Sequence, residues 1–474
     1  MLATYIVPVV LLAVIFLILF NYNRTLITLG GAVITTIVLL IDKFPFKDII
    51  SFLVGSETPD NFANFHTLVL IFGLLIITSI CNDSGVFSYI ALKIIQKSQG
   101  NKYILLFLLC LLAFGISVML SNLMSMLILI PLTITVCRIL AINPIPYLVC
   151  QMIIANTGCL IFMTSSFSNV LIGSAVPWTF SQFFLNIGLY SFLLFAILAL
   201  YLILIYRKRL DLPSTKMIQI LREYNAWLFV KDKRVFYLSF ITLIVTIILF
   251  AILPNYGVKM DIIAMSSGVF LLLSTGKNID YFLKKIDFQL ILYLLGIFLI
   301  IGAVQNLNIL DPIAEGLYSV TEGDPVVTSL LLLWLTAGLT AGIDNIPLAK
   351  ILIPITQTLT AGFTPAQTDM AYSATVFGIH LGDNLTPLGD NIIIATQISK
   401  SYEQQIPSKH IYRVGPISAL LQLTAVSLYL MIALQSSMLW ILILLIGTVL
   451  LIVIIVQLYR SNSLKFLRKQ VLIA

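Results

Sequence analysis

The chain has 474 residues, of which 60% are hydrophobic and 10% are charged. A soluble domain carries about 25% charged residues, so this composition excludes a soluble fold. The net charge of +7 does not indicate nucleic-acid binding, because the basic residues fall in short segments between apolar runs, where they set the orientation of a membrane protein.

Apolar runs of about 18 or more residues recur from residues 2–20 onward, and in lipid only a helix satisfies its own backbone over such a run. We therefore expect an all-α polytopic protein of the plasma membrane. In chain order, we predict N-terminal scaffold helices (1–64), a first repeat (65–206), a cytoplasmic linker with scaffold helices (207–287), a second repeat (288–434), and an extra C-terminal helix with a basic tail (435–474).

The two predicted repeats are related by one constant offset. Residue 288 falls on residue 65, and the same offset of 223 residues places Gly296 on Gly73, Asn345 on Asn122 and Pro354 on Pro131. The loop after the first copy is basic at 93–97, whereas its counterpart at 308–325 carries only acids, which predicts opposite orientations in the membrane. Inverted repeats place a binding site near the midplane, where they meet.

Polar residues interrupt the apolar pattern at four places, 121–122, 156–169, 344–345 and 382–391, and each looks like an interrupted helix or the tip of a hairpin. An ionised group in a bilayer costs about 3 kcal/mol on insertion scales, so carboxylates there indicate pairing or function. Carboxylates beside Asn and Thr oxygens suit Na⁺ or a proton. Asp383, Asn384, Asp390 and Asn391 are candidate Na⁺ ligands. The candidate substrate- and ion-binding residues are Ser121, Asn122, Asn156, Thr164, Ser165, Ser166, Ser168, Asn169, Asp344, Asn345, Asp383, Asn384, Thr386, Asp390 and Asn391.

Structural roles remain alternatives for these residues. Lys350 could neutralise Asp344, Asp383 and Asp390 could cap helix N-termini, and small hydroxyl side chains also line ordinary helix contacts in membranes. The repeated Gly-Asp-Asn at 382–384 and 389–391 favours function over capping.

At these motifs the chain resembles the ion transporter superfamily, in particular the branch of arsenite permeases, bacterial sodium–proton antiporters and the melanosomal P protein; citrate and dicarboxylate carriers are more distant relatives. The resemblance rests on Asn156, Gly158, Asn169, the Ile-Gly-Ser at 172–174, and the second-copy segments 344–347 and 382–391. It implies a homodimer in which each protomer has a scaffold and a mobile transport domain built from two re-entrant hairpins and two broken helices. The first copy departs from the family pattern at 159–162 and 166–168, and an ionised Asp344 would repel a dicarboxylate.

The sequence thus predicts a secondary active transporter of small ions coupled to H⁺ or Na⁺, of the arsenite or anion permease type or the Na⁺/H⁺ antiport type. A di- or tricarboxylate (citrate-like) symporter and an ion channel are the alternatives. We expect no enzyme, because the chain contains no HExxH, GxSxG or nucleotide-binding loop, and accordingly no catalytic residues and no cofactor beyond the coupling ion. The expected partners are the small ion substrate and the lipid bilayer.

Overall fold

The computed structural model describes residues 2–20, 22–55, 63–120, 122–176, 178–276 and 279–434; within these, the side chains of Asn122, Leu123, Thr215 and Asp390 are not described. Every regular element in this part of the chain is a helix. Eight of the described helices or joined helices are long and apolar enough to cross a membrane. They are Leu2–Leu19 (α1), Arg24–Ile41 (α2), Ala63–Asp83 (α4), Lys102–Met119 (α6), Phe180–Tyr206 (α10, η2 and α11), Lys233–Tyr256 (α13 and η4), Phe288–Asn306 (α16) and Ser408–Ala433 (α22).

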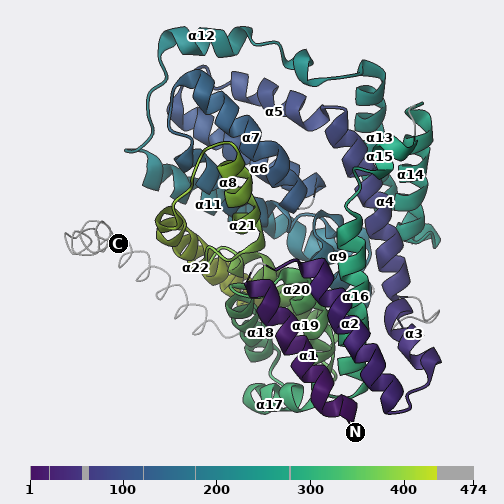
Figure 1. Ribbon diagram of the computed structural model, residues 1–474. Helices are drawn as coiled ribbons and strands as arrows, with labels where there is room; N and C mark the ends of the chain where they lie inside the picture. Colours follow the sequence, from purple (N-terminus) through teal and green to yellow (C-terminus); the bar gives the residue numbers. More distant parts are fainter. Residues whose placement is uncertain are drawn as a thin grey trace.

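The remaining α-helices complete the hairpins, the broken helices and the connections. They are Phe46–Val54 (α3), Val86–Gln96 (α5), Asn122–Leu140 (α7), Ile145–Gly158 (α8), Phe167–Ala175 (α9), Thr215–Glu223 (α12), Met260–Ser274 (α14), Ile279–Leu283 (α15), Asp311–Thr321 (α17), Pro325–Thr340 (α18), Asn345–Leu359 (α19), Pro365–Gly382 (α20) and Asp390–Ser401 (α21). In Figure 1, α12 lies at one end of the molecule and α17 at the opposite end.

Two helix pairs form the predicted hairpins. Hairpin 1 consists of α6 and α7, and hairpin 2 consists of α18, α19 and the turn 341–344. In hairpin 2 the turn ends because Asp344 caps α19: its Oδ1 accepts a hydrogen bond from the amide of Ile346 at 2.9 Å. An N-cap carboxylate satisfies an otherwise unpaired backbone amide, and this matters most where water is excluded.

Two helices are broken at polar segments. The first break separates α8, which ends at Gly158, from α9, and a short 3₁₀ turn, Met163–Ser165 (η1), lies within it. The second separates α20, which ends at Gly382, from α21. These segments carry unpaired backbone groups, which are tolerated at membrane depth only inside protein or beside water. The first break is largely buried, and in the second Asp383 and Asn384 are buried whereas Leu388 is exposed.

Glycine contacts between hairpins and broken helices correspond in the two halves. A Cβ on Gly158 would lie 2.5 Å from the carbonyl oxygen of Phe114 on α6, and a Cβ on Gly382 would lie 2.3 Å from that of Ala337 on α18. Only glycine allows helices to approach this closely.

The same correspondence links the scaffold helices. Gly73 of α4 packs on the backbone of Ala264 in α14, and Gly296 of α16 packs on the backbone of Thr28 in α2. The packing correspondence therefore includes α2 and α14, which lie outside the two repeats predicted from the sequence.

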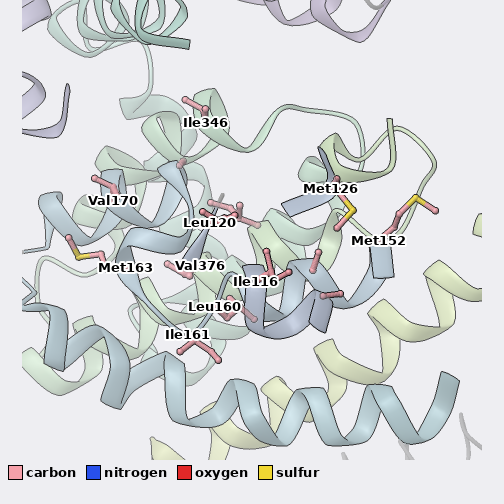
Figure 2. Packing of buried hydrophobic residues seen from close by; sticks show 14 of the residues in the cluster. Ile116, Leu120, Met126, Met152, Leu160, Ile161, Met163, Val170, Ile346 and Val376 are labelled. Atoms are coloured by element: carbon pink, nitrogen blue, oxygen red, sulfur yellow. The ribbon is translucent and has the colours of Figure 1, made fainter. Parts of the chain in front are cut away.

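An apolar shell surrounds the two breaks. Figure 2 shows Ile116 of α6, Leu160, Ile161 and Met163 of the first break, and Val170 of α9 in one region with side chains from the second half. Ile116 is 5% exposed and the other four are at most 2% exposed. This shell excludes water laterally, so polar side chains inside it must bond to one another or to a ligand.

Candidate functional site

The two breaks meet at Asn156, which lies in the last turn of α8 and is fully buried. Its Nδ2 donates to Asp383 Oδ2 at 2.9 Å and to Asn384 Oδ1 at 2.8 Å, both just after α20. Its Oδ1 accepts a short hydrogen bond from Asn391 Nδ2 in the first turn of α21. We call Asn156, Asp383, Asn384 and Asn391 the amide cluster.

The amide cluster contains an unsatisfied oxygen. Asn391 Oδ1 is buried and has no hydrogen-bond partner among the described residues. Gly389 also leaves space at the Asp383 carboxylate, since a Cβ there would lie 2.7 Å from Asp383 Oδ1. A buried acceptor without a donor costs about 1–3 kcal/mol, so this oxygen suits a bound cation, a water molecule or a proton on the neighbouring acid.

A second polar group, the histidine cluster, lies where α9 meets α20. Asn169 Nδ2 donates to the carbonyls of Cys159 at 2.7 Å and Phe162 at 3.4 Å, which holds the first break in place. Its Oδ1 must then accept from His380 Nε2 at 2.7 Å, so that ring nitrogen carries the proton. Ser168 Oγ lies 3.5 Å from the same nitrogen and 2.9 Å from Ser166 Oγ. His380 Nδ1 is buried without a partner among the described residues.

Each break is also tied to its own hairpin by one hydroxyl group. Ser165 Oγ donates to the carbonyl of Val118 at the end of α6, and Thr386 Oγ donates to that of Ala341 at the end of α18. The two acceptors are 223 residues apart, the same offset that relates the repeats in the sequence. Both bonds satisfy carbonyls that a helix end leaves unpaired.

The turn of hairpin 2 carries the remaining described site residues. Asp344 Oδ2 lies 3.7 Å from Arg24 Nη1, and the Asp344 side chain is 5% exposed. Asn345 Oδ1 accepts a short hydrogen bond from Thr340 Oγ. Asp344 therefore forms its ion pair with Arg24. Lys350, the partner considered from the sequence, instead places its ammonium over the Phe298 ring, 5.8 Å from the ring centre.

The structure distributes the predicted residues over these groups. Thr164 lies partly buried in the 3₁₀ turn and belongs to none of these groups. Ser121 lies outside the described residues; α7 begins at Asn122 and α21 at Asp390, but both side chains lie outside the described part. Asp383 follows the end of α20 and accepts from Asn156, so it does not cap a helix N-terminus.

Sequence reasoning did not include Arg24 or His380 among the site residues. Arg24 is the first charged residue of the chain, between two apolar runs, and His380 lies two residues before a Gly-Asp-Asn. Isolated ionisable residues in such surroundings are a usable signal.

Chemically, the amide cluster offers oxygens to a small cation, and His380 Nδ1 can accept a proton. Among the described residues, no group of three His, Cys, Asp or Glu side chains could hold a metal ion. Binding here would rely on amide and carboxylate oxygens, as expected for an alkali cation or a proton in transit.

Comparison with known proteins agrees with this architecture. The model of the citrate transporter family matches residues 9–378. A 46 kDa membrane protein of Mycobacterium leprae is 25% identical over 414 residues, which cover 86% of this chain and 93% of that protein. Magnetosome protein MamN of Magnetospirillum gryphiswaldense is 28% identical over 299 residues, covering 62% of this chain and 68% of MamN.

A solved structure shares the fold. The YdaH transporter of Alcanivorax borkumensis superposes with a TM-score of 0.55 at 15% sequence identity, covering 78% of this chain and 86% of that one. The expected all-α polytopic architecture and its location in the plasma membrane are thus confirmed. The chain belongs to the citrate transporter family and is an integral membrane transporter.

Proposed function

We propose that this protein is a secondary active transporter of small ions, coupled to H⁺ or Na⁺, and that the amide cluster holds the transported or coupling cation. The observation that carries the proposal is the buried, unsatisfied Asn391 Oδ1 in the cluster that also holds the Asp383 carboxylate. Three side chains of the second broken helix converge there on Asn156 of the first. So much buried polar surface is costly unless a ligand uses it.

The arrangement also favours a carrier over a channel. The amide cluster is closed in by the apolar shell, and its residues belong to both halves of the chain. A site at the contact between two halves gains access to either side when one part moves against the other. A channel would instead need a continuous wet path.

Transport by the purified protein in vesicles tests the proposal. We would load vesicles with a pH-sensitive dye and impose a Na⁺ gradient, then measure arsenite and citrate uptake with and without pH and Na⁺ gradients. We expect gradient-dependent ion movement by the parent and its loss in Asp383→Asn, which keeps the size and hydrogen-bonding capacity of the side chain but removes its charge.

Asp369→Asn is the matched control. Asp369 lies on the same helix, α20, but its Oδ1 accepts from Trp178 Nε1 at 2.7 Å, away from the amide cluster. This variant should transport like the parent. Equal transport by Asp383→Asn and the parent, with unchanged pH and Na⁺ dependence, would refute the assignment of the cation to this cluster.

A citrate-type symporter is the second candidate, and the family match favours it. The buried carboxylates Asp344 and Asp383 speak against a free tricarboxylate in their vicinity, because like charges at low dielectric repel strongly. Citrate uptake in the same vesicles separates the two candidates.

A further inference from the structure

We propose that Arg24 is a tethered counter-ion for Asp344, and that a proton displaces Arg24 from Asp344 during the transport cycle. This inference rests on the proposed function and adds a second, separate carboxylate to it. Arg24 would act as a positioning residue: it holds the turn of hairpin 2 against the scaffold until Asp344 is protonated.

The two partners are held differently. Asp344 is fixed because its Oδ1 caps α19, which leaves Oδ2 directed to Arg24. Arg24 starts α2 and is 31% exposed, and its long side chain lies over the Tyr293 ring, 5.3 Å from the ring centre. When the pair separates, the flexible guanidinium can therefore move into water, whereas the carboxylate stays buried.

The backbone that carries Arg24 is anchored to the scaffold. Thr25 Oγ donates to the carbonyl of Gln289 on α16 at 3.1 Å, and α2 packs closely on α16 at Gly296. The ion pair consequently joins two bodies, the α2–α16 scaffold and hairpin 2. Loss of the Asp344 charge would remove this electrostatic link.

A small cavity lies beside the carboxylate. Asp344 lines it together with Gly342, Ile343 and Pro347 of hairpin 2, and with Ile and Leu side chains of α1 and α16. Its volume of about 10 Å³ is about enough for one water-sized species. Among the described residues that line it, Asp344 alone has a side-chain oxygen, whereas Na⁺ needs several oxygen ligands, so the site favours a proton.

In the part of the chain that the structure describes, the following ionisable groups belong to elements packed against the pair. Arg24 on α2 and Tyr293 on α16 are described above, and Lys350 on α19 itself lies over a Phe298 ring of α16. His380 of α20 bonds to Asn169. Helix α17 precedes hairpin 2 in the chain and packs on α19, and it carries the acids Asp311 and Glu315.

The pH dependence of transport tests the proposal. In Arg24→Gln a proton no longer competes with the guanidinium for the Asp344 carboxylate, so the pH of half-maximal transport should move up by about one unit. Arg24→Lys should restore most of the parent profile. In Asp344→Asn the transport rate should no longer change around this pH, and the double variant Asp344→Asn/Arg24→Gln should have the same pH profile as Asp344→Asn alone.

Arg138→Gln is the charge control, because Arg138 donates to the Tyr402 carbonyl and not to an acid. It should leave the profile unchanged. The proposal is wrong if Arg24→Gln keeps the parent profile, or if it shifts the profile equally in the Asp344→Asn background. A raised KM for citrate in Arg24→Gln, without any pH shift, would assign Arg24 to substrate binding instead and also overturn it.

A second measurement is independent of transport. Ile343→Cys lines the cavity, and the five native cysteines are buried, so maleimide labelling of purified protein reports the closure of this turn. The labelling rate of Ile343→Cys is divided by that of Val320→Cys, an exposed site, to remove the intrinsic pH dependence of the thiol reaction.

We expect Arg24→Gln to raise the scaled rate at least about threefold, and acidification to raise it in the parent but not in Asp344→Asn. An unchanged rate would overturn the inference even if ion transport is found. If no ion is transported but the rates change as expected, the proposed function fails while the Arg24–Asp344 link stands.

Discussion

Asn391 donates its side-chain amide to Asn156 although the two residues are 235 positions apart. A corresponding contact joins His380 to Asn169, 211 positions apart. In each case the first turn of the helix after one break (α21 or α9) contacts the last turn of the helix before the other break (α8 or α20). The two breaks are thus interlocked by hydrogen bonds in both directions.

Asn156→Ala should remove all three hydrogen bonds of the amide cluster that pass through this residue. Asp383, Asn384 and Asn391 would each lose a partner while remaining in a water-excluded region, at a cost of about 1–3 kcal/mol per orphaned group. We expect a lower thermal unfolding temperature in detergent and loss of transport. Asn255→Ala, at an exposed position, is the control and should match the parent.

Gly382→Ala should destabilise the packing of α20 on α18. The new Cβ would lie 2.3 Å from the Ala337 carbonyl oxygen, which is backbone and cannot rotate away. Overpacking of this kind costs about 1–3 kcal/mol. Gly338→Ala, on α18 itself, is the matched control, because nothing lies within 4 Å of its added Cβ. Fluorescence-detected size-exclusion chromatography after heating compares them, and equal midpoints would show that the close approach is not needed.

Ser165→Ala and Thr386→Val should have similar effects, because each removes one hydroxyl that bonds a hairpin carbonyl. A buried neutral hydrogen bond contributes about 1 kcal/mol. The two sites share no partner, so we expect the double variant to lose about the sum. Thermal midpoints of the single and double variants measure this, and strong non-additivity would indicate that the two ties are coupled through the interlocked breaks.

Cysteine labelling tests the predicted sidedness of the loops. Basic segments remain in the cytoplasm, so residues 207–234 should be internal and residues 308–325 external. Leu212 is 76% exposed and Val320 is 66% exposed, so both positions accept a reporter cysteine. An impermeant thiol reagent added to intact cells should modify Val320→Cys only. Modification of Leu212→Cys from outside would reverse the topology.

The sequence by itself determined the class of this protein and the position of its polar interruptions. Water-excluded backbone must form helices, so runs of Leu, Ile and Val were sufficient to predict spans. The constant offset between the halves located both hairpins, and the clustering of Asn, Asp and Ser located both breaks. These features depend on local composition and on duplication, which are readable along one chain.

Only the tertiary structure decided which polar groups meet. Asn156 and Asn169 lie in one break, yet they bond to different partners in the other. Asp344 has Arg24 as its ion partner, 320 residues away in sequence, and not the nearby Lys350 considered from the sequence. Pairing across such distances is set by how the helices cross, because many side chains of suitable chemistry are available and only packing selects among them.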